Sequence, residues 1–140
     1  MTDTPKPIRI VLDTNVLVSA ILSPSGNPKK ILDLIFIQKL FPLFDGRIFS
    51  EYEEVLKREE LHLPQKAVDH VLSFLKENGG RVIAHPLSLK LPDPDDLPFL
   101  EVALTGNAEA LITGNKRHFP QTTKGTSIVN PLEFLEKWIF

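Results

Sequence analysis

The sequence predicts an α/β sandwich built around a mainly parallel sheet. Short apolar runs rich in β-branched residues alternate with segments whose apolar residues recur at helical spacing, and this alternation favours parallel strands joined by right-handed helical crossovers. The chain has 140 residues, of which 42% are hydrophobic, and this is enough to bury a continuous core. We therefore expect residues 1–140 to form a single domain.

The N-terminal third begins with a strand and continues with two helices. Residues 8–13 (IRIVLD) are almost continuously apolar, as expected for a strand that is buried on both faces and ends at Asp13. Residues 14–22 (TNVLVSAIL) are expected to form a helix, which the prolines and glycine of residues 23–28 bring to an end. A second helix is expected over residues 29–39, because its apolar residues return at helical spacing.

The middle of the chain predicts another strand, two helices and a third strand. Residues 40–45 (LFPLFD) are too short for a helix and are expected as the second strand. The next helix should begin near Ser50, because Ser50 and Glu53 have the spacing of a capping box. Residues 64–80 are expected to form a helix that ends at a pair of glycines, and residues 81–85 (RVIAH) a third strand.

The C-terminal part begins with a loop. Residues 86–98 contain four prolines, and the apolar spacing of residues 99–107 predicts a helix that starts close to Asp96. Two further strands and a closing helix are expected at residues 110–113, 127–130 and 131–140.

Four polar residues stand where predicted strands lead into helices or turns. Asp13 ends the first strand, Glu51 opens the helix after the second, Asp96 opens the helix after the third, and Asn115 follows the fourth. In an open parallel sheet these junctions lie at one edge, so we expect the four residues to gather there. Clustered carboxylates repel one another unless a cation neutralises them, and a hard divalent ion such as Mg²⁺ or Mn²⁺ prefers oxygen ligands. Such a site is suited to phosphodiester hydrolysis.

Each carboxylate also has a plainer interpretation. Asp13 could merely cap the next helix, with Thr14 and Asn15 orienting it or capping as well. Glu54 shares a helix face with Glu51 and is the alternative to it, although we prefer Glu51.

The acidic loop offers a similar choice. Of its three aspartates we choose Asp96 for the metal, assign Asp93 to turn chemistry, and regard Asp95 as a candidate helix cap.

The segment after the fourth strand is less specific. Asn115 alone would be an ordinary turn residue, and only the other three residues suggest a role for it. His118 is a weaker candidate for contact with the metal or the substrate, and a surface or packing role is the more common one for a histidine. Lys116 and Arg117 could contact phosphates, although basic loop residues are usually just solvated. His62, His70 and His85 have no such constellation around them.

The motifs around these four residues resemble those of the PIN-domain family, particularly its small VapC-type toxins. The resemblance covers nearly the whole chain and rests on LDTNVLVSA at Asp13, SEYEEVLKR at Glu51, DPDDLPFLEVAL at Asp96 and LITGNKRHF at Asn115. It implies a three-layer α/β/α sandwich with a four- or five-stranded parallel sheet, Mg²⁺ or Mn²⁺ at the acidic cluster, and endonucleolytic cleavage of RNA. One departure is Asn115 itself, because relatives often have another acid in this region.

The resemblance also implies partners, since VapC-type proteins commonly form homodimers and are inhibited by an antitoxin protein. Eight large apolar residues of the predicted helices could supply a self-association surface, or could all pack in the core: Ile35, Phe36, Ile37, Phe134, Leu135, Trp138, Ile139 and Phe140.

Composition limits the other functional classes. Sixteen basic and eighteen acidic residues give a net charge of −2, so no overall positive field attracts nucleic acid. Cysteine is absent and no signal peptide or spanning helix is expected, which favours the cytoplasm. A haloacid-dehalogenase type phosphotransferase would need an acid where Asn15 stands, and the phosphate-binding glycine motifs are missing. The main alternative is a catalytically weakened RNA- or protein-binding module with the same fold.

Overall fold

The computed structural model describes residues 5–120 and 123–140, which form one parallel sheet covered by helices. Its strand order is β3-β2-β1-β4-β5, and every pair of neighbours is parallel. The strands are β1 (Ile8–Leu12), β2 (Leu40–Phe44), β3 (Gly80–Arg81), β4 (Ala110–Ile112) and β5 (Ser127–Val129). The predicted parallel sheet is thereby confirmed, and it has the larger of the two expected strand numbers.

Within the described residues, six α-helices form the outer layers. They are α1 (Thr14–Leu22), α2 (Asn27–Phe36), α3 (Gly46–Leu56), α4 (Gln65–Asn78), α5 (Leu97–Thr105) and α6 (Pro131–Trp138). Three short 3₁₀ turns accompany them: η1 (Glu59–Leu61), η2 (Pro94–Asp96) and η3 (Lys116–His118).

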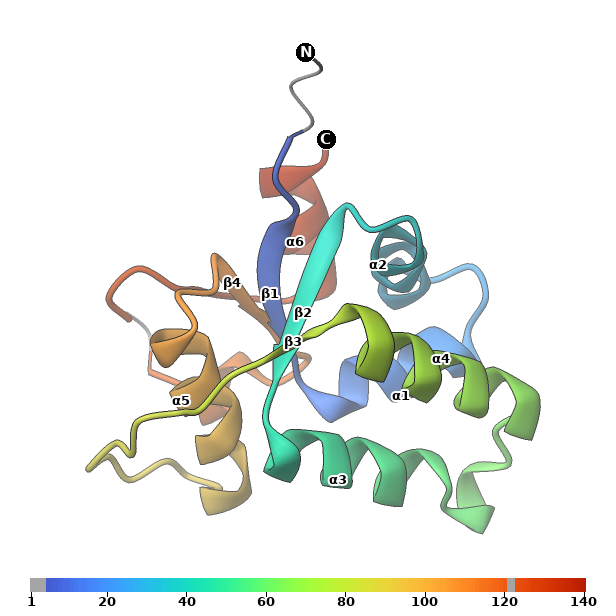
Figure 1. Ribbon diagram of the computed structural model, residues 1–140, viewed down its shortest axis with the longest axis horizontal. Coiled ribbons are helices and arrows are strands. Elements are labelled where there is room, and N and C mark those ends of the chain that lie inside the picture. The colour runs from blue at the N-terminus through green and yellow to red at the C-terminus, as the bar shows by residue number, and fades with distance from the viewer. Residues whose placement is uncertain (1–4, 121–122) are drawn as a thin grey trace.

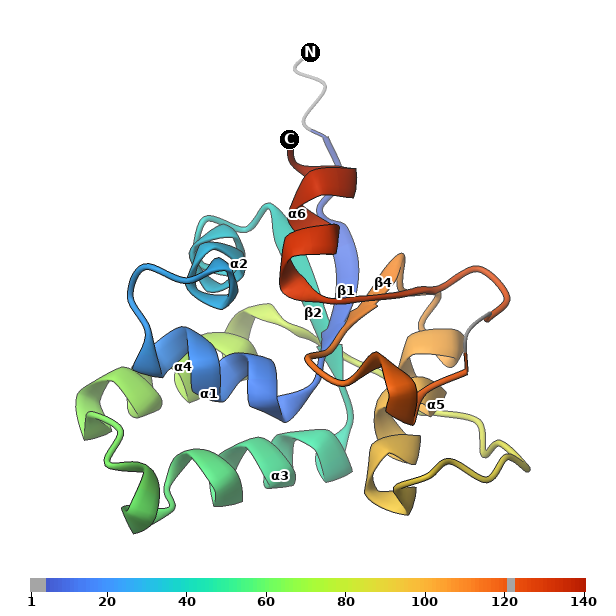
Figure 2. The ribbon, with the colours of Figure 1, turned by 180° about the vertical axis from the view of Figure 1, so that it is seen from behind.

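The helices are divided between the two faces of the sheet. Helix α6 passes in front of the strands in Figure 2, with α2 and α1 beside them on the left, and α2 contacts both α6 and β2. Helix α5 lies at the lower left of the strands in Figure 1 and contacts β1, β2 and β4. Helices α3 and α4 extend to the right of the sheet in Figure 1. This is the expected three-layer α/β/α sandwich. None of the helices in the described parts of the chain is long and apolar enough to cross a bilayer.

The central strand carries the core. Ile10, Val11 and Leu12 are at most 1% exposed, as expected for a strand covered on both faces. Phe99 from α5 and Phe134 from α6 are equally buried, one in each helical layer.

The start of α3 differs from the sequence prediction. The helix begins at Gly46 rather than near Ser50, because the Asp45 side chain accepts a hydrogen bond from the backbone N–H of Ile48 at 3.0 Å and so caps the helix. The capping box expected at Ser50 and Glu53 is therefore wrong. Glu51 consequently lies in the second turn of the helix.

The third strand is also shorter than expected. It comprises Gly80–Arg81, and residues 82–85 of the predicted strand leave the sheet. Val82 still donates a backbone hydrogen bond to Phe44 at 2.9 Å, but the N–H of His85 donates to Thr105 Oγ1 of α5 at 2.9 Å. Side chains of α5 thus replace the neighbouring strand as hydrogen-bond partners.

Candidate metal centre

The site begins at the carboxyl ends of the two central strands. Asp13 follows β1 and Thr113 follows β4, and the Thr113 hydroxyl donates a hydrogen bond to Asp13 Oδ2 at 2.7 Å. Asp13 is 6% exposed. It occupies the N-cap position of α1, yet its side chain makes no capping hydrogen bond. The capping role considered for Asp13 is therefore not what fixes its carboxylate, which is held by Thr113.

Helix α3 brings Glu51 to the same edge of the sheet. The Thr14 hydroxyl donates a hydrogen bond to Glu51 Oε2, so the Thr14 side chain orients Glu51, while the Thr14 backbone supplies a hydrogen bond to the Asp13 carboxylate. The neighbouring Tyr52 is buried and donates a 2.6 Å hydrogen bond to the carbonyl of Leu12, which fixes α3 against the end of β1.

The alternative acid of this helix lies elsewhere. Glu54 is exposed and forms a 2.9 Å ion pair with Arg58, which lies just beyond the end of α3. Of the two glutamates, Glu51 is therefore the one that lies near the other carboxylates.

Asp96 enters from the loop before α5 and meets a histidine. Its Oδ2 lies 2.9 Å from His118 Nδ1 of η3. Asp93 caps η2 by accepting a hydrogen bond from the N–H of Asp95 at 3.0 Å, which confirms its turn role. Asp96 occupies the N-cap position of α5, so Asp95 is not the helix cap. Asp93, Asp96 and His118 also offer ligand atoms that all lie within 4.8 Å of one another.

The turn after β4 points its predicted residues in different directions. Asn115 is exposed, and its backbone N–H donates to Thr113 Oγ1 at 3.0 Å. Lys116 pairs with Glu133 of α6 at 3.0 Å, and Arg117 is exposed. Among the residues that the structure describes, no side-chain hydrogen bond joins Asn115 to the three carboxylates.

The surroundings of Asp13, Glu51 and Asp96 disfavour the ionised forms of these carboxyl groups, so that their pKa values are raised. Burial raises the pKa of Asp13, and the hydrogen bond from Thr113 opposes this only in part. Burial and then the charge of Asp13 raise the pKa of Asp96 to about 6, and the hydrogen bond from His118 partly counteracts them. Burial also raises the pKa of Glu51, and the negative charges of Asp13 and Asp95 raise it further.

This donor set fits a hard divalent cation. Three partly desolvated carboxylates whose ionised forms are disfavoured gain most from a nearby positive charge. Their oxygens are the ligands that Mg²⁺ and Mn²⁺ prefer, and a single imidazole is compatible with Mn²⁺. The residues present are therefore suited to the ion that the sequence predicted.

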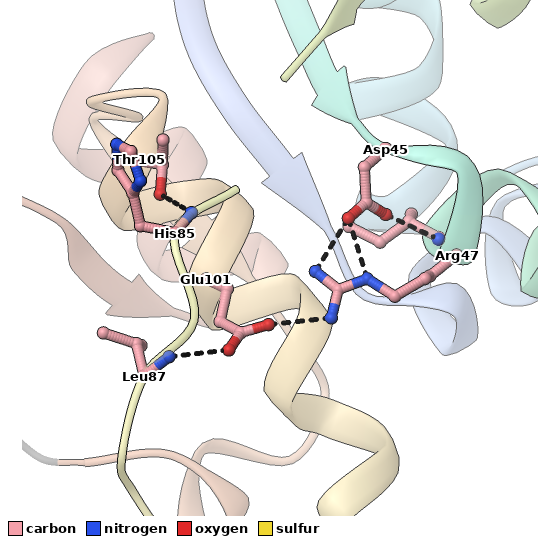
Figure 3. Close-up of polar contacts among 7 residues, drawn as sticks. Asp45, Arg47, His85, Leu87, Glu101 and Thr105 are labelled. Atoms are coloured by element: carbon pink, nitrogen blue, oxygen red, sulfur yellow. Dashed lines mark hydrogen bonds and ion pairs between the residues drawn. The ribbon is translucent and has the colours of Figure 1, made fainter. Parts of the chain in front are cut away.

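An ion pair between the buried Glu101 and the half-exposed Arg47 holds the loop that leads to the site (Figure 3). Glu101 of α5 is 4% exposed and accepts hydrogen bonds from Arg47 Nη1 and from the N–H of Leu87, both at 2.8 Å. Arg47 also pairs with Asp45 at 2.7 Å. Together with Thr105, Glu101 fastens the segment after β3 along the helix whose N-terminal end carries Asp96.

The sequence analysis missed several of these contributors. Thr113 could have been found, because it follows a buried strand just as Asp13 does. The proximity of Asp93 to Asp96 and His118, and the contacts of Glu101, depend on how the loop before α5 lies along that helix. No local sequence pattern indicates this path.

Comparisons with known proteins agree with this geometry. Residues 9–117 match the family model described as PIN domain. The chain is also 34% identical over 112 residues to the uncharacterized protein MJ1680 of Methanocaldococcus jannaschii, an alignment that covers 78% of this chain and 72% of that protein. PIN domains are typically metal-dependent nucleases, and the acidic cluster described above is consistent with that general activity. The match over most of its length shows that the chain belongs to the PIN domain family.

Proposed function

We propose that this protein is a Mg²⁺- or Mn²⁺-dependent endoribonuclease of the cytoplasm and the toxin component of a toxin–antitoxin pair. The observation that carries the proposal is the gathering of Asp13, Glu51 and Asp96 at one edge of the sheet, partly buried and with raised pKa values. Partly buried carboxylates with raised pKa values are more typical of functional sites than of structural ones. Their ionised forms destabilise the folded protein unless a cation or another positive group compensates their charge.

The proposed roles follow from the contacts of each side chain. Asp13, Glu51 and Asp96 hold the ion, with Thr113 orienting the first and Thr14 the second. When bound, the ion would lower the pKa of a water molecule and neutralise charge on the phosphodiester. Asn115 is proposed as the fourth member, through an amide oxygen that contacts the ion or the substrate.

The charge distribution supports dependence on a cation. The net charge is −2, and of the two basic residues that follow Asn115 in the chain, Lys116 is paired with Glu133 and Arg117 is exposed. A polyanion therefore has little side-chain charge to meet at this edge, and we propose that RNA phosphates are held mainly through the ion.

The test is cleavage of a labelled single-stranded RNA by purified protein, with Mg²⁺ or Mn²⁺ and with excess EDTA. We expect cleavage only with the ion, and a loss of at least about a hundredfold in Asp13→Asn and Asp96→Asn. Glu54→Gln is the matched control, because Glu54 is an exposed acid on α3 directed toward Arg58. Equal cleavage in EDTA, or normal activity of Asp96→Asn, would reject the mechanism.

We also propose homodimerisation and an antitoxin partner. Of the apolar residues singled out in the sequence, Ile35, Phe134 and Leu135 are buried, but Ile37 is 62% and Phe140 is 77% exposed. These two exposed side chains and Ile139 line one hollow beside α2 and α6, which supports a docking role for this surface. Sedimentation at micromolar concentration tests the dimer, with Ile37→Ser as the disrupting variant. A strictly monomeric wild-type protein would reject the dimer.

Co-expression with a neighbouring small gene tests the antitoxin. A gene product that neither binds this protein nor relieves RNA cleavage would count against the antitoxin.

The second candidate function is a catalytically weakened RNA- or protein-binding module, and the amide at Asn115 favours it. A metal titration coupled to RNA cleavage separates the two. RNA binding without cleavage at any metal concentration would support the binding module and reject the nuclease.

A further inference from the structure

We propose that His118 is a direct ligand of the divalent ion, and that the resulting mixture of oxygen and nitrogen donors makes the site prefer Mn²⁺ to Mg²⁺. This inference rests on the proposed function, because it concerns the same ion at the same edge of the sheet.

The spacing of the ligand atoms is that of a coordination shell. In an octahedral site with bonds of roughly 2.1 Å, adjacent ligand atoms are about 3 Å apart and opposite ones are about 4.2 Å apart. His118 Nδ1 and Asp96 Oδ2 are separated by 2.9 Å, and the ligand atoms of Asp93, Asp96 and His118 all lie within 4.8 Å of one another. One ion could therefore contact all three residues with small side-chain adjustments, when the imidazole is in the tautomer whose Nδ1 carries no proton and the hydrogen bond to Asp96 is exchanged for bonds to the ion.

The position of His118 is fixed by the turn that carries it. The N–H of Asn115 donates to Thr113 at the start of η3, Lys116 pairs with Glu133 of α6, and Phe119 directly after the turn is 5% exposed. With both ends held, the backbone presents the imidazole to Asp96 and leaves the Asn115 side chain exposed. His118 is also close enough to Asp13 to lower its pKa, so the imidazole lies near Asp13 as well as Asp96.

The donor chemistry determines the preference between the two ions. Mg²⁺ requires near-ideal octahedral geometry and oxygen ligands. Mn²⁺ also favours oxygen ligands, but as a first-row transition metal it accepts a nitrogen ligand in place of one oxygen more readily than Mg²⁺ does. A set of carboxylates would accept either ion. Replacing one oxygen by the nitrogen of His118 disfavours Mg²⁺ more than Mn²⁺, because Mg²⁺ binds imidazole poorly.

The test measures metal binding by the full-length protein without RNA. MnCl₂ and MgCl₂ are titrated by calorimetry, and the electron spin echo of bound Mn²⁺ is examined for coupling to a histidine nitrogen. We expect the wild-type protein to bind Mn²⁺ at least about tenfold more tightly than Mg²⁺, with a nitrogen coupling that changes on ¹⁵N-histidine labelling. His118→Gln should lose most of this preference and the coupling. The control is His85→Gln, which changes an exposed histidine elsewhere and should retain both the preference and the coupling.

The outcomes separate this inference from the proposed function. Bound Mn²⁺ without nitrogen coupling in the wild-type protein would overturn it, even if His118→Gln failed to fold and whether or not RNA is cleaved. A coupling that survives in a folded His118→Gln protein would overturn it as well. A nitrogen coupling in a protein that never cleaves RNA would support His118 as a ligand while rejecting the ribonuclease. If neither ion bound, both would be rejected.

Discussion

Replacing Asp96 by asparagine should stabilise the metal-free protein at neutral and alkaline pH. Burial and the charge of Asp13 raise the pKa of Asp96 from 3.8 to about 6 in the folded protein. The folded state therefore binds this proton more tightly than the unfolded state does. The contribution to stability is fully present below about pH 4 and is lost as the pH rises through about 6. Asparagine has no proton to lose, so the variant lacks this dependence.

The magnitude follows from the size of the shift. Roughly two pKa units at about 1.4 kcal/mol each correspond to about 3 kcal/mol in total, and about half of this is lost between pH 5 and pH 8. In EDTA, the unfolding free energy of Asp96→Asn relative to the wild-type protein should therefore rise by about 1.5 kcal/mol between these pH values. With saturating Mg²⁺ at pH 8 the order should reverse, because only the wild-type protein gains the free energy of binding.

Urea unfolding at pH 5, 6, 7 and 8, in EDTA and in Mg²⁺, measures these differences. Asp33→Asn is the matched control, because Asp33 is an exposed aspartate on α2 that pairs with Lys29. A difference between Asp96→Asn and wild-type protein that stays constant from pH 5 to pH 8 in EDTA would refute the reasoning.

Three further predictions concern the supports of the site. Thr113→Val removes the hydroxyl that donates to Asp13, so we expect the free energy of unfolding in urea to fall by about 1–2 kcal/mol. Mn²⁺ binding measured by calorimetry should also weaken. A variant with wild-type metal affinity would show that Asp13 needs no such support. Asn115→Asp should tighten Mg²⁺ binding in the same assay, whereas an unchanged affinity would make Asn115 peripheral. Glu101→Ala should lower the free energy of unfolding by about 2–3 kcal/mol, because the N–H of Leu87 and Arg47 lose their acceptor. Arg47→Ala should cost a comparable amount, because it leaves the buried Glu101 carboxylate without its cation, and the double variant should cost clearly less than the sum of the two; additive losses in urea unfolding would argue against this coupling.

The order of elements could be predicted from sequence because it depends on local patterns. Ile10, Val11 and Leu12 form an unbroken apolar run, and such a run reports a strand covered on both faces whatever surrounds it. The start of α3 could not be predicted with the same success, because Asp45 and Ser50 both precede plausible first turns. Only the backbone direction after β2 decides that Asp45 is the cap.

The candidate site divides in a similar way. Asp13 and Asp96 could be placed at one edge of the sheet because strand direction alone brings those junctions together. The direction of His118 could not be predicted, since it depends on Lys116 reaching Glu133 in a distant helix and on the burial of Phe119. The early end of β3 has a comparable cause, because its replacement partners are side chains of α5.

The central pairing of β1 with β4 has a consequence for protein synthesis. Thr113, which holds Asp13, lies one hundred residues later in the chain, and Asp96 and His118 also belong to the last third. A growing polypeptide displays Asp13 and Glu51 long before these partners leave the ribosome, so the ion-binding cluster can assemble only once most of the chain has been made. Unfinished translation products would therefore lack the complete cluster. Folding of such distant contacts is also expected to be slow, which delays the onset of activity after release.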